Sequence, residues 1–465
     1  MSITPSTARA DPMELWALPS ATAVRKMQQG TMAPEDYLAS HLARIEATEP
    51  SVRAWENLDS ASAIAQAQRV SRVPLDARAA LPLFGLPVGV KDVIDVEGLP
   101  TGAGFEPYRG RPATSDAAVI ARMRRAGAII VGKTTTTQFA WGQDAPKTRN
   151  PWNLEHTPGG SSSGSPAALA AGHIQIGVGT QTASSLLRPA SYCGVVGLKP
   201  SYGRISCKGI FPTSWTSDHP GFVARSVLDV AVALDVCSGH DPEDPHSARI
   251  PVESYAAAAA TPRQPRLGVL IDYLERSTPE VQRGFESAVQ ILGVAGAKIE
   301  KIHLPVDLDL IMAIHWATSN AEAVTSHASQ FAHHAEHYLP TVRLRFEVGH
   351  LIPAMAYVQA RRAHRRIRPQ MRAMFEGIDA IIAPTSSDRP PRLNPPPKER
   401  PLGDTTFQLA SSAFGYPAIT LPAGLGPDAL PYAVQLFAPA FHECALLGAA
   451  AWCEAALPAL PAPLQ

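Results

Sequence analysis

The stretch that decides the fold runs from Thr157 to Ser206 and reads TPGGSSSGSPAALAAGHIQIGVGTQTASSLLRPASYCGVVGLKPSYGRIS. Its first turn, TPGGSSSGS, opens into an alanine-rich helical segment, whose first backbone N–H groups would point into the turn. Two apolar segments typical of buried strands follow, at Ile174–Val178 and Gly194–Leu198. A Gly/Ser run is more often a flexible linker. Here it lies inside an apolar α/β region, which favours a functional site over a linker.

A second serine-rich turn, TQTASSLLR from Thr180 to Arg188, follows the first buried segment. Its small residues could expose one hydroxyl and several backbone N–H groups. N–H donors grouped in this way can stabilise the oxyanion of a tetrahedral intermediate. An ordinary tight turn explains the segment equally well.

The flanking sequence alternates between strands and helices. Leu86–Lys91 and Ala128–Gly132 indicate strands on either side of a helix at Ala117–Arg125, and a further strand–helix–strand unit occupies about 267–302. This order predicts an α/β fold, with a mixed, mostly parallel central sheet covered by helices on both faces. We expect one large domain made of an N-terminal helical segment (1–70), a core (71–240) and a remainder (241–465) with variable helices at about 310–375.

Composition excludes several classes of protein. The 465 residues carry a formal net charge of +0, and 18% are charged, so nothing favours nucleic acid or an anionic membrane as partner. We expect no signal peptide and no transmembrane segment, because no apolar stretch is long enough. The five cysteines form no CxxC pair, which favours reduced thiols in a cytoplasmic protein.

A serine nucleophile needs a base. The sequence shows no G-x-S-x-G nucleophile elbow, because the letters GSSSG at 160–164 do not follow an apolar strand. Most histidines lie between His315 and His364, with no acidic partner at suggestive spacing. Lys91 ends an apolar strand, where burial would lower its pKa as a lysine base requires. A lone lysine after a strand is more often a surface residue, so the residues alone leave both interpretations open.

Three motifs in order resemble the amidase signature family: GLPVGVKDVIDVEGLPT, GGSSSGS and TQTASSLLRPASYCGVVGLKPSYGRIS. The resemblance extends over most of the chain through VGKTTTTQFAWG, SDHPGFVARSVLDVA and GYPAITLPAG, with a looser match at 240–375.

The resemblance implies a catalytic triad of Lys91 as base, Ser161 as proton shuttle and Ser185 as nucleophile, with a cis peptide bond between Gly160 and Ser161. The family spacing of 24 residues from Ser161 selects Ser185 over Ser184. It also implies an oxyanion hole formed by the N–H groups of Thr182, Ala183, Ser184 and Ser185.

The same resemblance implies a hydrolase that cleaves amides, or related carbamates (urethanes) and aryl amides, through a seryl acyl-enzyme. It implies no metal or organic cofactor, a small-molecule substrate, and a monomer or homodimer. The physiological substrate and the preferred bond lie beyond the sequence.

The second turn departs from the commonest family form, D-T-G-G-S, because Gln181 and Ser184 replace Asp and Gly; Ser163 also replaces a common Gly. A serine at position 184 would be strained if that position requires a positive φ, or its hydroxyl faces the pocket. Two alternatives remain. One is the glutamine-hydrolysing subunit of a tRNA-dependent amidotransferase, which normally carries the Asp form, and the other is a non-catalytic scaffold.

The substrate pocket is expected to be shaped by Phe139, Trp141, the helices at 310–375 and the Pro-rich loop at 388–401. The side chains of Trp316, Tyr338 and Phe346 would either line a pocket for an apolar or aromatic part of the substrate, or simply pack in the core between helices. The basic run at 361–366 would meet an acidic ligand or form a solvated helix face.

Overall fold

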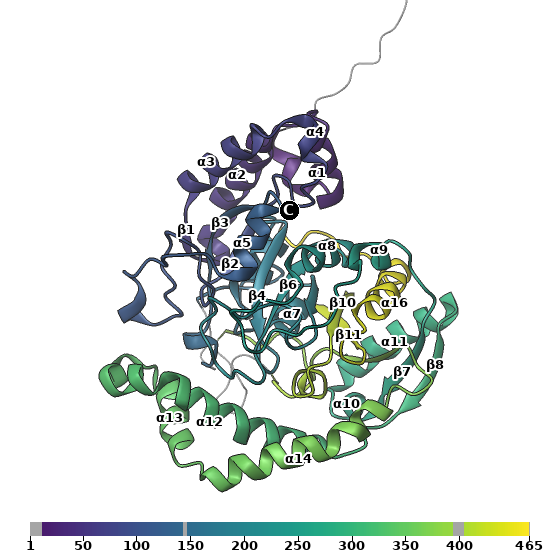
Figure 1. Ribbon diagram of the computed structural model, residues 1–465. Helices are drawn as coiled ribbons and strands as arrows, with labels where there is room; N and C mark the ends of the chain where they lie inside the picture. The colour runs from purple at the N-terminus through teal and green to yellow at the C-terminus, as the bar shows by residue number, and fades with distance from the viewer. Residues whose placement is uncertain (1–11, 143–146, 394–403, 465) are drawn as a thin grey trace, which may run out of the picture.

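An 11-stranded mixed sheet forms the centre of the computed structural model, which describes residues 12–142, 147–393 and 404–464 (Figure 1). The strand order is β1-β3-β2-β4-β6-β5-β10-β11-β9-β7-β8. The strands are β1 (Trp55–Leu58), β2 (Pro87–Lys91), β3 (Ile129–Thr134), β4 (Ile176–Gln181), β5 (Val196–Lys199), β6 (His219–Ala224), β7 (Arg266–Leu270), β8 (Lys298–Ile302), β9 (Ala380–Pro384), β10 (Ala418–Leu425) and β11 (Pro431–Phe437).

The α/β class and the mixed sheet are as expected, but parallel pairing is less extensive than the sequence suggested. It is confined to β3–β2–β4 and β8–β7–β9. The remaining neighbours pair antiparallel. The physical reason lies in the connections: β10 and β11 form a hairpin, and β5 returns through a loop to β6, which inserts antiparallel between β4 and β5. Strands β1 and β6 were not expected from the sequence.

Helices cover both faces of the sheet, as predicted. One face packs against helices α5, α8, α11 and α16. The other face packs against α2, α3, α6 and α7 at one end and against α10, α12 and α14 at the other. The bounds are α2 (Pro34–Val52), α3 (Ser60–Ser71), α5 (Ala118–Arg125), α6 (Gly164–Ala170), α7 (Leu187–Tyr192), α8 (Val227–Cys237), α10 (Ile271–Glu275), α11 (Pro279–Ala295), α12 (Leu308–His334), α14 (Ala354–Ala373) and α16 (Glu443–Ala456).

The shorter helical elements lie between these. They are η1 (Pro12–Ala17), α1 (Ser20–Gln28), α4 (Leu75–Arg78), η2 (Glu106–Tyr108), η3 (Gln138–Ala140), α9 (Tyr255–Ala259), η4 (Ala335–His337), α13 (Pro340–His350) and α15 (Leu409–Ser412).

Local sequence explains where several helices begin and end. Helix α11 starts with Pro279, which is preset for a first helical position, and is terminated by Gly296 with a φ of 115°. The side chains of Asp59 and Ser226 cap α3 and α8 by accepting hydrogen bonds from the N–H groups of Ser62 and Asp229.

Helices α12, α13 and α14 lie along one side of the molecule, away from the N-terminal helices (Figure 1). They occupy the segment predicted to be helical and substrate-shaping. Within the described residues, no helix is long and apolar enough to span a bilayer. All five cysteines are free thiols, and Cys193, Cys237 and Cys453 are buried in the core.

Candidate active site

The three predicted motifs meet at one edge of the sheet. Strands β2 and β4 are parallel neighbours, so their carboxyl ends, Lys91 and Gln181, lie at the same edge. The loop that precedes α6 packs across β4 at Gly179, where an added Cβ would lie 2.9 Å from Ser162 Oγ. A side chain at position 179 would push the serine loop away from the strand.

Lys91 is fully buried at the end of β2, so the interpretation as a surface lysine is wrong. Its Nζ lies 2.7 Å from Ser161 Oγ and 2.8 Å from Thr180 Oγ1. Burial lowers the pKa of Lys91 well below its ordinary value, and the negative charge of Asp218 opposes this shift only in part. The amine is therefore able to accept a proton.

Ser161 follows a cis peptide bond from Gly160, as the resemblance implied. The adjacent serine joins this loop to the second turn: Ser162 Oγ donates to Thr180 O at 3.2 Å, and Ser162 N donates to Ser185 O at 3.0 Å. Ser163 is also buried, and its N–H donates to Ser161 O at 2.9 Å. The two serine-rich turns thus form one hydrogen-bonded unit.

Ser161 and Ser185 line the same cavity, of about 100 Å³, together with Thr182, Ala183 and Ser184. No acceptor among the described residues takes a hydrogen bond from the backbone N–H groups of residues 182–185. Ser184 is not among the residues with positive φ, so the strain considered for a serine at this position is absent. The turn offers a hydroxyl and several N–H donors to a bound carbonyl group.

Gln181 anchors the turn that carries Ser185. Its Oε1 accepts hydrogen bonds from Leu186 N at 3.0 Å and Leu187 N at 2.9 Å, and its Nε2 donates to Ser412 Oγ at 3.0 Å. Ser412 Oγ in turn donates to Ala183 O at 2.8 Å. An amide at position 181 therefore supplies both the acceptor for the turn and a donor toward α15. Sequence reasoning missed Ser412, which is distant in the chain and lies in no motif.

Asp218 supports the same turn from the other side. One carboxylate oxygen accepts from Thr182 Oγ1 at 2.6 Å, and the other accepts from the N–H groups of Thr213 and Ser214 at 2.8 Å. Burial raises the pKa of Asp218 to about 6, although these hydrogen bonds favour the charged form. Asp218 lies in SDHPGFVARSVLDVA, a segment that contributes to the family resemblance. The sequence analysis assigned no role to this residue.

Helices α12 and α13 supply the outer wall of the cavity. Met312, His315, Trp316 and Ser319 come from α12, and Arg345 comes from α13. Burial and the charge of Arg345 lower the pKa of His315 to about 4, so this imidazole is neutral at pH 7. The sequence reasoning missed both His315 and Arg345, because neither lies in a motif.

Of the residues expected to shape the pocket, some line the cavity and others lie in the core. Trp141 and Trp316 line the cavity, whereas Phe139, Tyr338 and Phe346 belong to an aromatic core cluster. Residues 394–403 of the Pro-rich loop lie outside the described residues. The basic run at 361–366 does not line the cavity, and Arg361 contacts Thr216 Oγ1 at 3.2 Å.

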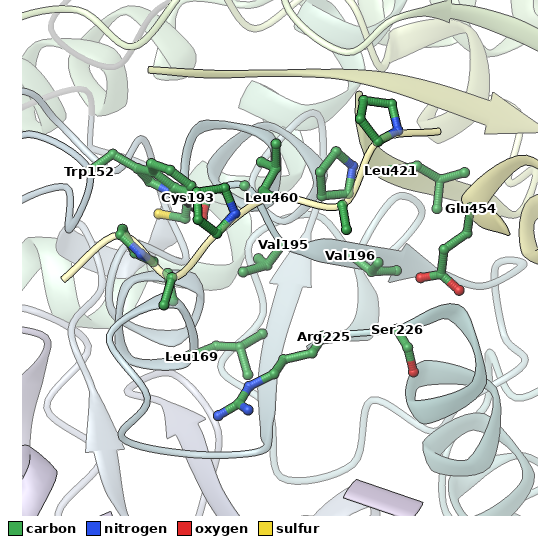
Figure 2. Close-up of a pocket in the computed structure, with 18 of the residues that line it drawn as sticks. Trp152, Leu169, Cys193, Val195, Val196, Arg225, Ser226, Leu421, Glu454 and Leu460 are labelled. Atoms are coloured by element: carbon green, nitrogen blue, oxygen red, sulfur yellow. Dashed lines mark hydrogen bonds between the residues drawn. The ribbon is translucent and has the colours of Figure 1, made fainter. Parts of the chain in front are cut away.

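A larger cavity, of about 480 Å³, lies beneath the C-terminal tail (Figure 2). Its polar groups are engaged in holding the structure together: Arg225 donates to Trp16 O and Ala17 O, and Glu454 accepts from Val227 N. Leu460 of the tail and Val195 lie on its apolar walls. Ser161 and Ser185 are not among its lining residues, so this cavity is separate from the one that the two serines share.

Potential metal ligands lie elsewhere. In the part of the chain that the structure describes, the group of three that could hold an ion is His334, Glu336 and His337, at the carboxyl end of α12. None of these residues lines the serine cavity.

Known proteins match this arrangement over nearly the whole chain. The family model described as Amidase matches residues 36–447. The chain belongs to the amidase signature family, and it is accordingly an amidase-type hydrolase. An amidase from Pseudomonas putida is 33% identical over 90% of this chain and 91% of its own length.

Two other relatives show the breadth of the family. One, from Roseiflexus castenholzii (strain DSM 13941 / HLO8), is a subunit of the glutamyl-tRNA(Gln) amidotransferase. It is 33% identical over 93% of this chain and 94% of its own length. A solved structure, described as an unexpected vestigial protein complex that reveals the evolutionary origins of an s-triazine catabolic enzyme, superposes with a TM-score of 0.87. It is 29% identical and covers 94% of this chain and 98% of its own.

Proposed function

We propose that this protein hydrolyses small carboxylic amides, or related carbamates and aryl amides, through an acyl-enzyme on Ser185. The observation that carries the proposal is the contact of 2.7 Å between the buried Lys91 Nζ and Ser161 Oγ, in a cavity that Ser161 shares with Ser185. A buried amine with a lowered pKa is the base that a serine nucleophile needs.

In the proposed mechanism, neutral Lys91 accepts the proton of Ser161, and Ser161 accepts the proton of Ser185. Ser185 Oγ then attacks the carbonyl carbon, and the N–H groups of residues 182–185 stabilise the oxyanion. Ser161 returns a proton to the leaving amine as the C–N bond breaks. Water then hydrolyses the acyl-enzyme by the same proton path in reverse, releasing the carboxylic acid.

An active-site-directed fluorophosphonate tests this assignment. We expect the wild-type protein to be labelled on Ser185 and the Ser185→Ala variant to remain unlabelled. Absence of labelling, or labelling that persists in Ser185→Ala, would refute the nucleophile and favour a non-catalytic scaffold. A hydrolysis screen over aliphatic amides, aryl amides and carbamates then identifies the preferred bond.

A second candidate is the hydrolysis of glutamine as one component of a tRNA-dependent amidotransferase. The 33% identity to the Roseiflexus castenholzii amidotransferase protein over 93% of the chain favours it. The departure at Gln181 and Ser184 from the Asp-Thr-Gly-Gly-Ser form argues against it. Hydrolysis of L-glutamine that depends on the other amidotransferase components would support this alternative over a self-sufficient amidase.

A further inference from the structure

Arg345 lies in the outer wall of the serine cavity between two tryptophan rings. Its Cζ is 4.2 Å from the ring centroid of Trp141 and 5.2 Å from that of Trp316. Nη1 donates to Trp141 O at 2.7 Å, which fixes the guanidinium at the cavity. The planar group is thus held in place before any ligand arrives.

The charge of Arg345 has no acidic partner in the described part of the chain. Burial lowers its pKa to about 10, so the guanidinium stays charged at neutral pH. His315 beside it is neutral. The edge formed by Nε and Nη2 meets no acceptor among the described residues, and Nε is buried. A positive group that no described carboxylate neutralises therefore faces the cavity that contains Ser185.

We propose that Arg345 binds a carboxylate of the substrate, and that the substrate class is half-amides of short dicarboxylic acids. This deepens the proposed function and rests on it. A carboxylate matches the free edge of a guanidinium by two parallel hydrogen bonds. The small cavity favours a short acyl chain, with the amide carbonyl at Ser185 and the carboxylate at Arg345.

The cavity also selects against an ammonium group. None of its described lining residues is acidic. The α-amino group of L-glutamine would therefore be desolvated beside Arg345 with no carboxylate to pair it, at a cost in binding free energy. Glutaramate, which is L-glutamine without that amino group, is expected to be the better substrate.

The test compares glutaramate, the neutral glutaramide and L-glutamine as substrates. For the wild type we expect kcat/KM for glutaramate to exceed that for glutaramide by about 10- to 100-fold, the equivalent of one charge-assisted contact. Arg188 also lines the cavity, but its guanidinium donates to Gly160 O and Asp404 O. Arg345→Met should therefore bring this ratio close to one, mainly through KM for glutaramate. Arg345→Lys keeps the positive charge but loses the paired N–H donors of the guanidinium. It should therefore recover part of the preference for glutaramate over glutaramide.

Arg343→Gln is the matched control. Arg343 lies on the same helix, but it is exposed and pairs with Glu347 at 2.8 Å, so its loss should leave the ratio unchanged. A wild-type ratio near one, or a ratio that survives Arg345→Met, would overturn the proposal. A clear preference for L-glutamine over glutaramate would do the same.

Binding to the Ser185→Ala variant separates this proposal from the proposed function. Quenching of tryptophan fluorescence, with Trp141 and Trp316 beside Arg345, should report tighter binding of glutaramate than of glutaramide without turnover. If Ser185→Ala shows this binding preference, but the fluorophosphonate does not label the wild type and the wild type hydrolyses no amide, the proposed function fails and the carboxylate site stands. If the wild type is labelled and hydrolyses an aryl amide, but Ser185→Ala binds both compounds equally, the carboxylate site fails alone.

Discussion

Lys91, Ser161 and Ser185 lie on buried strand ends and turns of the central sheet, whereas Arg345 and Trp316 come from α13 and α12 on one side of the molecule. On the sheet side, Lys91 donates to Thr180 Oγ1, Thr182 Oγ1 donates to Asp218, and the N–H of Leu186 donates to Gln181. The helical side is more open, and Trp316 is 44% exposed. If these residues act as proposed, the chemistry is built into the core, while substrate recognition comes from helices at the side of the molecule.

Ser185→Ala should produce the largest effect, because it removes the atom that forms the acyl-enzyme. We expect kcat to fall by up to about 10⁶-fold, as when a serine nucleophile is removed from another hydrolase. Ser184→Ala is the neighbouring control and should cost less than about 10-fold. Steady-state hydrolysis of an aryl amide measures both, and a larger loss in Ser184→Ala would reverse the choice between the two serines.

Lys91→Ala should lower kcat/KM by about 10²–10⁴-fold, the usual loss when a general base is removed. Because the base must be neutral, wild-type kcat/KM should fall as the pH decreases through the lowered pKa of Lys91 and rise as the pH increases. The residual kcat/KM of Lys91→Ala should not show this fall at low pH. A variant that keeps more than about a tenth of the wild-type rate would contradict the role of Lys91.

A second buried lysine provides a contrast in stability. Lys133 pairs with Asp92 at 3.0 Å, and both side chains are buried. Lys133→Ala should lower the free energy of unfolding by about 3–5 kcal/mol, because it leaves Asp92 charged and unpaired. Lys91→Ala should cost no more than about 1.5 kcal/mol, since its described contacts are with hydroxyl and carbonyl groups rather than an acid. Urea denaturation measures both; equal losses would mean that Lys91 is also held as a structural cation.

These contrasts show what could be predicted from the sequence. The motifs located Lys91, Ser161 and Ser185, short apolar runs located most strands, and the segment 310–375 was expected to be helical, as α12–α14 are. Strand β6 was missed because HPGFVA carries a Pro and a Gly and lacks a strand pattern. Ser412 and Arg345 were missed because their roles depend on contacts across more than 150 residues of sequence, with Ala183 and Trp141. Such contacts follow from tertiary packing and have no local signal.

Ser412→Ala tests whether α15 positions the turn that carries Ser185, the proposed nucleophile. The change removes the donor to Ala183 O and the acceptor for Gln181 Nε2, so the N–H donors of the turn should shift. We expect kcat to fall by up to about 10²-fold, with a smaller change in KM. Ser411→Ala is the matched control, because Ser411 Oγ donates to Gln408 O at the start of the same helix. Equal kcat values for the two variants would remove Ser412 from the positioning of the turn.

The smallest effect is expected on the outer face of α14, which carries the basic run noted in the sequence. Arg366 is exposed there and does not line the cavity. Solvent and salt screen such a charge beyond about 8 Å, so Arg366→Ala should change the free energy of unfolding by less than about 0.5 kcal/mol. KM for glutaramate should stay within about twofold of wild type at physiological salt. A larger rise in KM for glutaramate, with no rise in KM for glutaramide, would mean that the outer face of α14 also attracts the anionic substrate. Recognition of the carboxylate would then not be confined to Arg345.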